Sequence, residues 1–391
     1  MVRVNAGHKM KSFVWEMTVV TLTTALFIQG CSKEPERVRS NEILIGAAAP
    51  LTGKYAEMGK DLTNAIQMAV EEQNARGGIA GKKVRLVIED DMASPKDAVT
   101  VAHKLVGNEE ILGVVGHMNS GTTLPAATVY ADAGVVLVMP VPTNPDITKQ
   151  GLKNLIRVPI TDDKQGPALI SFVIDRLKKG RVAIIHNKEA YGEGIATEAQ
   201  KSLQERAIPA VLFEGVNADT TDFRPTISKV LSVNPDAVFF GGGTSEAALL
   251  IKQAREQGLT VPFIMGDGCF DTQLIKIAGQ AAEGSFVSNI APTTAPTPRA
   301  QEFYAQFEQK YGKIVAFAPL GYVAAGILMD GISKAPERTR QGVLQALTNP
   351  SYKYDSILGE FSFESNGDAK GQHVFIHEVK DGHFITVPAT R

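Results

Sequence analysis

Four short loops carry the polar side chains of this chain that are best suited to holding a small charged molecule. Each of them follows a run of apolar residues, and they are residues 115–123, 139–145, 186–194 and 265–268. In an open parallel sheet, ligands bind beyond the carboxyl ends of the strands. If the apolar runs are parallel strands, the four loops are where a binding site is expected.

The first two loops offer hydrogen-bond donors. Ser120 follows Gly116-His117-Met118-Asn119 at the expected start of a helix, and Thr143 places a second hydroxyl after the next apolar run. Unpaired backbone N–H groups and the helix dipole stabilise an anion at such a position. N-capping of the helix by Ser120 or Thr123 is the purely structural alternative.

The other two loops offer an aromatic ring and an acid. Tyr191 stands at the mouth of the third loop, where it could cover an apolar or cationic group, and Asp267 lies between Gly266 and Gly268. A carboxylate that loses its water suits an ammonium group through charge-assisted hydrogen bonds. An ordinary surface turn for Tyr191 and a turn-forming aspartate for Asp267 are the alternatives.

Signatures of catalysis are weak in this sequence. It has no phosphate-binding loop, no Gly-x-Gly-x-x-Gly after the first apolar run and no Gly-x-Ser-x-Gly elbow. Ser120 with His117 could imitate a nucleophile and its base, but three residues at a tight turn rarely aim both side chains at each other. His373 and His377 share a face of a predicted strand without a third metal ligand. We therefore expect a binding protein with no cofactor and no metal, and not an enzyme.

Composition sets the class of protein. The chain has 391 residues, 44% of them hydrophobic and 21% charged, with a formal net charge of −2. A charge so close to zero lacks the basic excess that binding to nucleic acid requires. The length and hydrophobic content predict a globular fold of two or three domains.

Two series of short apolar runs alternate with amphipathic stretches, which predicts two α/β units with parallel sheets. The first series has strands near 43–48, 84–89, 112–116 and 135–139, with helices at 59–75, 95–106 and 122–133. The second has strands near 181–186, 211–215, 237–240 and 263–265, with helices at 165–178, 192–206, 222–231 and 245–256. A Pro/Thr-rich connection, 292–298, leads to helices at 299–311, 320–333 and 339–347. Asp381-Gly382 between 374–379 and 383–387 predicts a β-hairpin.

The N-terminus has the composition of an export signal. Three basic residues precede an apolar stretch from Phe13 to Ile28, which is too short and too interrupted for a comfortable membrane span. Ile28-Gln29-Gly30-Cys31 resembles the lipobox of bacterial lipoproteins, although Gln29 departs from the usual small residue. We expect residues 1–30 to be removed, Cys31 to carry lipid and residues 31–41 to form a tether; an ordinary signal peptide is the alternative. The other cysteine, Cys269, is expected to be a small buried residue.

Several phrases occur in an order that resembles the periplasmic binding proteins of the leucine/isoleucine/valine-binding type, the receptors of ABC importers. They include Pro50-Leu51-Thr52-Gly53, the segment 74–81 with its Gly-Gly-Ile-x-Gly phrase, Gln165-Gly166-Pro167 and Tyr191-Gly192-Glu193-Gly194. The similarity extends through most of the chain after the export signal. It implies two doubly wound lobes joined by a three-crossing hinge, with crossings near residue 160, near Ala291 and near Gln372.

The resemblance also implies roles for individual residues. Ser120, Thr143 and the backbone of Val141 match positions that bind a ligand's α-carboxylate, while Asp267 and Tyr191 match positions near its α-ammonium. Three positions depart from the family pattern: Met58 and Gly243 stand in place of tyrosines, and Asn119 stands in place of a cysteine. Met118 and the aromatic Tyr322 are expected to line the apolar part of the pocket.

By the same resemblance, residues 42–159 with 291–371 form one lobe and residues 160–290 with 372–391 form the other. The ligand is expected to be a free amino acid, branched-chain or otherwise apolar, bound in the cleft between the lobes. A monomer anchored by lipid in the periplasm or at the cell surface would deliver it to a membrane permease. The alternative is an extracytoplasmic sensor for a small amide, urea or organic acid.

Overall fold

The computed structural model describes residues 41–292 and 297–388. The predicted export signal, Cys31 and all but the last residue of the predicted tether lie outside the described residues. Two large sheets organise the described chain, and a third sheet is a short hairpin. None of the helices in the described ranges combines the length and the apolar composition that crossing a bilayer requires.

The first sheet has five parallel strands in the order β2-β1-β3-β4-β5. They are β1 (Glu42–Ala49), β2 (Lys83–Asp90), β3 (Ile111–Gly116), β4 (Val136–Met139) and β5 (Leu155–Arg157). The runs in β1, β3 and β4 are almost continuously apolar and buried, as expected for strands that helices cover on both faces.

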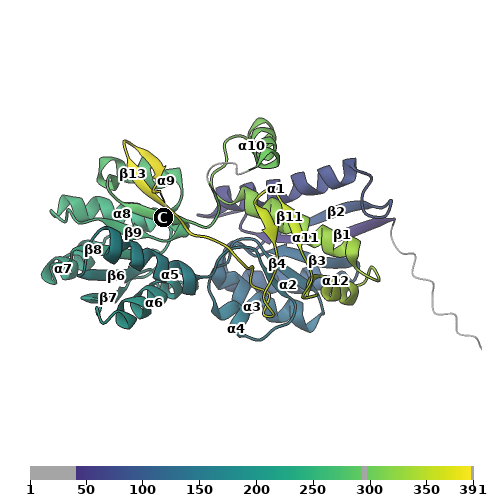
Figure 1. The fold of residues 1–391 in the computed structure, drawn as a ribbon, viewed down its shortest axis with the longest axis horizontal. Coiled ribbons are helices and arrows are strands. Elements are labelled where there is room, and N and C mark those ends of the chain that lie inside the picture. Colours follow the sequence, from purple (N-terminus) through teal and green to yellow (C-terminus); the bar gives the residue numbers. More distant parts are fainter. Residues whose placement is uncertain (1–40, 293–296, 389–391) are drawn as a thin grey trace, which may run out of the picture. The chain divides into compact units, whose positions relative to one another are not determined.

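The helices of the first sheet come from two distant parts of the sequence. The early ones are α1 (Ala56–Ala75), α2 (Pro95–Gly107), α3 (Ser120–Asp132) and α4 (Asp146–Lys149). The late ones are α10 (Pro298–Tyr311), α11 (Ala318–Lys334) and α12 (Arg340–Leu347). The apolar α11 packs against α1, β3 and β4, so the chain returns to the first sheet after residue 297 (Figure 1). The hairpin of β11 (Tyr354–Ser356) and β12 (Gly359–Phe361) follows. We call this sheet and these helices lobe 1.

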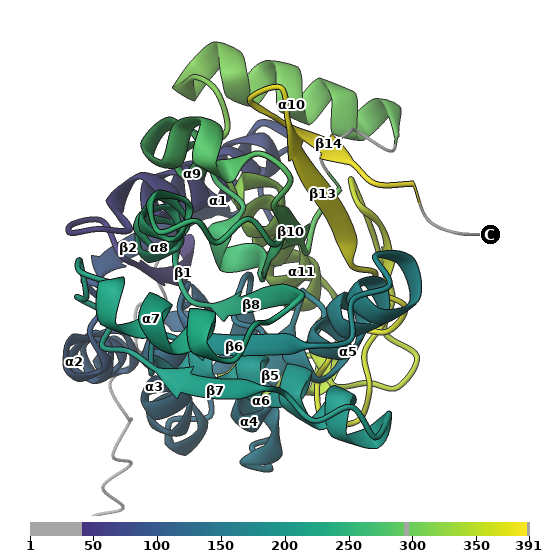
Figure 2. The ribbon, with the colours of Figure 1, turned by 90° about the vertical axis from the view of Figure 1, so that its left-hand side faces the viewer.

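The second sheet has seven strands in the order β14-β13-β10-β9-β8-β6-β7 (Figure 2). Its parallel strands are β6 (Val182–His186), β7 (Leu212–Gly215), β8 (Ala237–Gly241), β9 (Phe263–Met265) and β10 (Phe286–Asn289). The strands β13 (Phe375–Lys380) and β14 (His383–Thr386) extend it in antiparallel fashion. This confirms the predicted hairpin, whose turn residues Asp381 and Gly382 both have positive φ, 51° and 71°.

The helices of the second sheet follow its strands closely. They are α5 (Asp162–Ser171), which continues as a turn of π-helix at Phe172–Arg176, α6 (Ala190–Glu205), α7 (Arg224–Ser232), α8 (Thr244–Glu256) and α9 (Thr272–Ala278). We call the second sheet and these helices lobe 2. The chain runs from one large sheet to the other between β5 and β6, after β10, and between β12 and β13.

The mixed α/β architecture with two mainly parallel sheets is the predicted one. The elements that the sequence did not predict are short: the strands β5, β10, β11 and β12 and the helices α4 and α9, of three to seven residues each. A segment of that length is too short to display a helical or strand period in its side chains.

Candidate ligand-binding cleft

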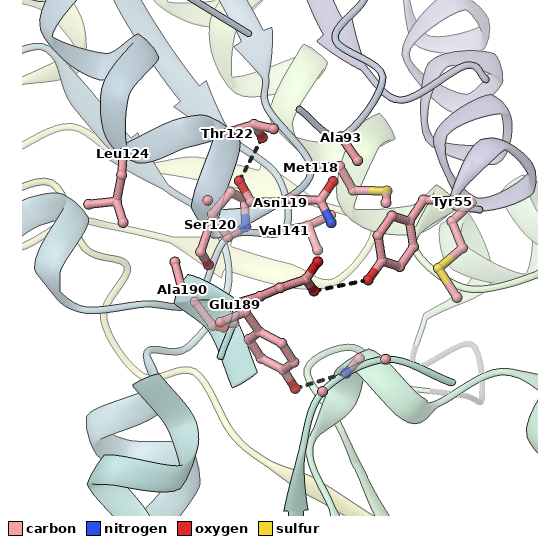
Figure 3. Close-up of a pocket in the computed structure, with 18 of the residues that line it drawn as sticks. Tyr55, Ala93, Met118, Asn119, Ser120, Thr122, Leu124, Val141, Glu189 and Ala190 are labelled. Atoms are coloured by element: carbon pink, nitrogen blue, oxygen red, sulfur yellow. Dashed lines mark hydrogen bonds between the residues drawn. The ribbon is translucent and has the colours of Figure 1, made fainter. Parts of the chain in front are cut away.

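A cavity of about 360 Å³ lies where loops of both lobes meet. Eight of the nine residues that the sequence predicts as ligand contacts line it; they are Met58, Met118, Asn119, Ser120, Val141, Thr143, Tyr191 and Asp267. Figure 3 shows Ser120, Asn119 and Val141 from lobe 1, with Glu189 and Ala190 from lobe 2 across from them. The loops that follow strands thus converge, as the parallel-sheet argument predicts.

The Ser120 end of the cavity presents hydrogen-bond donors. Ser120 is the first residue of α3, and no side chain caps this helix. The hydroxyls of Thr122 and Thr123 both donate to the carbonyl of Asn119, each at 2.8 Å. The capping alternative for Ser120 and Thr123 is therefore wrong. A helix start without a side-chain cap leaves N–H groups of its first turn available to an anion.

A buried arginine that the sequence analysis did not single out orders the loop carrying Val141 and Thr143. The Arg157 side chain is 0% exposed and its Nη1 donates to the carbonyls of Pro142, at 3.1 Å, and Asn144, at 2.8 Å. Its Nε lies 2.8 Å from a carboxylate oxygen of Asp368, and its Nη2 donates to Thr148 at 3.0 Å. The guanidinium thus holds the backbone of the loop on both sides of Thr143.

The opposite end of the cavity is built around Asp267. Its carboxylate accepts hydrogen bonds from the Tyr191 hydroxyl and from Gln165 Nε2, each at 2.9 Å. Asp267 is 3% exposed, and burial raises the pKa of its carboxyl to about 6, although the two donors act in the other direction. No ion pair within residues 41–292 and 297–388 includes Asp267. At neutral pH this site therefore offers a buried negative charge to a cation.

The two glycines beside Asp267 make room for Tyr191. A Cβ atom at Gly266 would lie 2.3 Å from the Tyr191 hydroxyl, and one at Gly268 would lie 2.6 Å from its ring. The backbone N–H of Gly268 donates to the same hydroxyl at 2.9 Å. The tyrosine hydroxyl thus accepts from the backbone and donates to Asp267. The Gly-Asp-Gly sequence is explained by this close approach.

One of the nine predicted ligand contacts lies away from the cavity. Tyr322 does not line the cavity: its hydroxyl donates to Glu72 at 2.6 Å, and its ring packs on Phe303, with 4.7 Å between ring centres. Tyr322 lies within α11, on a side of the helix that faces α1 and α10. Phe317, immediately before α11, is the aromatic residue from this region that lines the cavity.

The rim of the cleft carries charged contacts between the lobes that the sequence analysis missed. Lys54 Nζ lies 3.0 Å from a carboxylate oxygen of Glu246 and 3.5 Å from one of Glu189. The Tyr55 hydroxyl donates to Glu189 at 3.3 Å (Figure 3). A Cβ atom at Gly243 would lie 2.8 Å from Glu246 and 3.1 Å from the Tyr55 hydroxyl, so the glycine leaves space for this cluster.

The residues considered for catalysis or metal binding have other surroundings. Nδ1 of the buried His117 lies 2.7 Å from Asp91 and its Nε2 lies 3.2 Å from the Tyr130 hydroxyl, so neither nitrogen is directed at Ser120. Of the two histidines considered for metal binding, His377 is buried and His373 is exposed. The described residues contain no group of three or more side chains that could hold a metal ion. Cys269 is buried and free, as expected, and donates to the carbonyl of Gly242 at 3.4 Å.

Comparison with known proteins decides the family. Residues 42–383 match a family model described as periplasmic binding protein. The chain belongs to this family. A relative, the Leu/Ile/Val-binding protein homolog 2 of Brucella abortus, is 36% identical over 341 residues, which cover 87% of this chain and 91% of the relative.

Solved structures agree with this periplasmic binding protein in fold. The leucine-binding protein LivK of Thermotoga maritima has a TM-score of 0.81 at 28% identity, covering 88% of this chain and 98% of its own. The binding protein LivJ of Streptococcus pneumoniae, solved with isoleucine, has a TM-score of 0.80 at 26% identity, covering 88% and 99%. The two doubly wound lobes predicted from the sequence are thus confirmed as the fold of a periplasmic receptor.

Proposed function

We propose that this periplasmic binding protein is the amino-acid receptor of an ABC importer, which binds a free, branched-chain or otherwise apolar α-amino acid and delivers it to a membrane permease. The observation that carries the proposal is the pairing of opposite polarities across one cavity. A helix start and two hydroxyls face it from lobe 1, and the buried acid Asp267 faces it from lobe 2. Relatives named for leucine, isoleucine and valine support the choice of ligand.

The two charged groups of an amino acid have matching partners here. We assign its carboxylate to the Ser120 and Thr143 hydroxyls and to the backbone at Val141, and its ammonium to Asp267 and Tyr191. Charge-assisted hydrogen bonds of this kind are about twice as strong as neutral ones. Because the site is buried, water competes poorly with the hydrogen bonds between the ligand and these residues.

The rest of the cavity suits an apolar side chain. Met58, Met118, Val141 and Phe317 line it, and together they offer flexible and aromatic apolar surface. An isobutyl or sec-butyl group buried there gains about 25 cal/mol for each Å² of apolar area removed from water. We expect leucine, isoleucine and valine to bind more tightly than charged amino acids.

The ligand would favour closure of the two lobes, because only the closed form brings both sets of partners to the same molecule. We place the lobe boundaries at 159/160, 290/291 and 371/372, which fall in connections between the two large sheets. We further propose a monomer that is tethered to the membrane by lipid on Cys31, which lies outside the described residues. Release of the protein from membranes by Cys31→Ser, with Cys269→Ser as the control, would test the tether.

The ligand is tested by calorimetry and thermal unfolding with the twenty amino acids. Saturation at 1,000 times the Kd raises the free energy of unfolding by about 4 kcal/mol, which a thermal-shift panel detects readily. 4-Methylpentanoate, which lacks the ammonium, and isopentylamine, which lacks the carboxylate, serve as matched controls and should fail to bind. If none of the twenty amino acids binds more tightly than about 1 mM, the proposal is wrong.

A further inference from the structure

A second buried acid lies behind the cavity wall, next to Thr143. Asp162 is the first residue of α5 and is 0% exposed, and its backbone N–H donates to the Thr143 carbonyl at 2.9 Å. Thr143 Oγ1 and Asp162 Oδ2 are both buried, and within residues 41–292 and 297–388 neither has a hydrogen-bond partner other than the other. Two neighbouring polar atoms without partners in a buried place are costly unless they serve each other or a ligand.

One glutamine amide joins this acid to the acid of the cavity. Gln165 Nε2 donates to Asp267 Oδ1 at 2.9 Å and to Asp162 Oδ1 at 3.4 Å. Its Oε1 accepts from the Ser288 hydroxyl at 2.6 Å and from the Asp267 backbone N–H at 3.3 Å, which fixes the direction of the amide. Two buried carboxylates that share one donor repel each other when both are ionised.

The cation near Asp162 and Asp267 is already bound to other groups. Arg157 is the nearby cation, but its ion pair goes to Asp368 and its other donors go to Thr148 and to the loop carbonyls. Burial, followed by the charge of Asp267, raises the pKa of the Asp162 carboxyl well above its ordinary value, with Thr143 and Arg157 acting in the opposite direction. Asp163 adds further negative charge on the same helix, so it too favours the protonated form.

Two other titratable groups of lobe 2 lie next to Asp267, and both are neutral at pH 7. Burial raises the pKa values of the Tyr191 hydroxyl and of the Cys269 thiol well above their ordinary values. Neither group therefore brings a charge to the pair at that pH. These directions favour a single proton on the Asp162–Asp267 pair, held by Asp162, with the negative charge on Asp267, which lines the cavity.

We propose that Asp162 is a positioning residue, which carries a proton, donates it in a hydrogen bond to Thr143 Oγ1, and so leaves the Thr143 hydroxyl proton free to point at the carboxylate of the ligand. An ionised Asp162 would instead accept the Thr143 proton, and the hydroxyl would turn a lone pair toward the ligand. The two acids therefore have different tasks: Asp267 holds the ammonium and Asp162 directs a donor at the carboxylate. This inference rests on the proposed function.

Infrared spectroscopy tests the protonation state directly. The carbonyl band of a protonated carboxylic acid should be present at pH 7 in the wild-type protein, both without ligand and with L-leucine, and absent from Asp162→Asn. Asp163→Asn is the matched control, because its carboxyl belongs to the same helix, and it should keep the band. A band that is absent from the wild type, or that survives Asp162→Asn and disappears in Asp267→Asn, overturns the inference.

Leucine affinity tests the role in positioning. Asp162→Ala removes the donor to Thr143 and should weaken leucine binding about tenfold at pH 7. Asp162→Asn, whose amide can still donate, should keep most of the affinity that Asp162→Ala loses. In a Thr143→Val background, Asp162→Ala should cause no further loss, since the hydroxyl it orients is gone. Equal losses in Asp162→Ala and Asp162→Asn, or additive losses with Thr143→Val, overturn the inference. If Asp162→Ala does not fold, the leucine affinity of Asp162→Asn and the infrared band still test the inference.

The outcomes separate this inference from the proposed function. A wild-type protein that binds leucine without an acid band contradicts only the role of Asp162. A wild-type protein that binds no amino acid contradicts the proposed function itself.

Discussion

The cleft contains acidic side chains with polar partners in two different surroundings, at its rim and in its interior. At the rim, Lys54 and Glu189 keep 41% and 42% of their side-chain surface exposed while they interact across the cleft. In the interior, Asp267 is 3% exposed and Gln165 is fully buried. Exposed ion pairs contribute about 0–1 kcal/mol and are weakened by salt, whereas a buried charge that loses its partner costs several kcal/mol. The interior should therefore select the ligand, while the rim adds a modest preference for the closed form.

The largest effect is expected from Asp267→Asn. Without the negative charge, the ammonium of leucine would be buried next to neutral groups, and its binding should weaken by more than about 2 kcal/mol, or roughly 30-fold. Calorimetric titration with leucine measures this loss. Asp271→Asn is the matched control, because Asp271 caps α9 through Gln273 and does not line the cavity, and asparagine caps equally well. An unchanged affinity in Asp267→Asn would mean that the interior acid is only structural.

Lowering the pH should reproduce part of that loss in the unmodified protein. The pKa of Asp267 is raised to about 6, so below pH 6 the carboxyl gains a proton and the ammonium must displace it. Affinity for leucine should therefore be constant from pH 8 to 7 and fall about tenfold for each unit below pH 6. Titrations in buffers of different ionisation enthalpy should show up to one proton released per leucine at pH 5. A flat profile between pH 7 and 5 would contradict the assignment.

A smaller effect is expected from Ser120→Ala. The backbone N–H groups at the start of α3 remain in this variant, so leucine loses one donor out of several and should weaken by about 1–1.5 kcal/mol. Thr128→Ala removes an exposed hydroxyl from the same helix and should leave the Kd unchanged. A loss in Ser120→Ala as large as that in Asp267→Asn would show that the anion end depends on this hydroxyl far more than the helix-start argument allows.

The smallest effect is expected at the rim, from Lys54→Met. Its contacts with Glu246 and Glu189 help to hold the lobes together, so the variant should weaken every ligand by the same factor, corresponding to less than about 1 kcal/mol. The difference from wild type should shrink as salt rises. Lys60→Met, an exposed lysine on α1, is the control. A loss that varies from one amino acid to another would place Lys54 in the ligand site.

The sequence predicted the parts of the fold and the cleft that repeat a simple pattern. Alternating apolar runs and amphipathic stretches identified both parallel sheets, and the rule that loops after strands bind ligands led to Ser120, Thr143 and Asp267. Tyr322 was misplaced because a residue within the largely buried helix α11 has no periodic signal that tells which neighbour it faces.

The missed residues depend on contacts that join distant parts of the chain. Tyr55 and Glu189 are 134 residues apart in sequence, and Gln165 and Asp267 are 102 apart. Arg157 would be read from sequence as a surface residue at the end of a three-residue strand, but it is fully buried because the carbonyls of Pro142 and Asn144 and the carboxylate of Asp368 surround it. Local periodicity carries no information about such pairings.

A crystal structure of the protein with L-leucine tests the central claim most directly. We expect leucine in the cavity, with its carboxylate within hydrogen-bond distance of the Ser120 and Thr143 hydroxyls and its ammonium on Asp267 and Tyr191. Leucine bound in the reverse orientation, or bound outside this cavity, would contradict it.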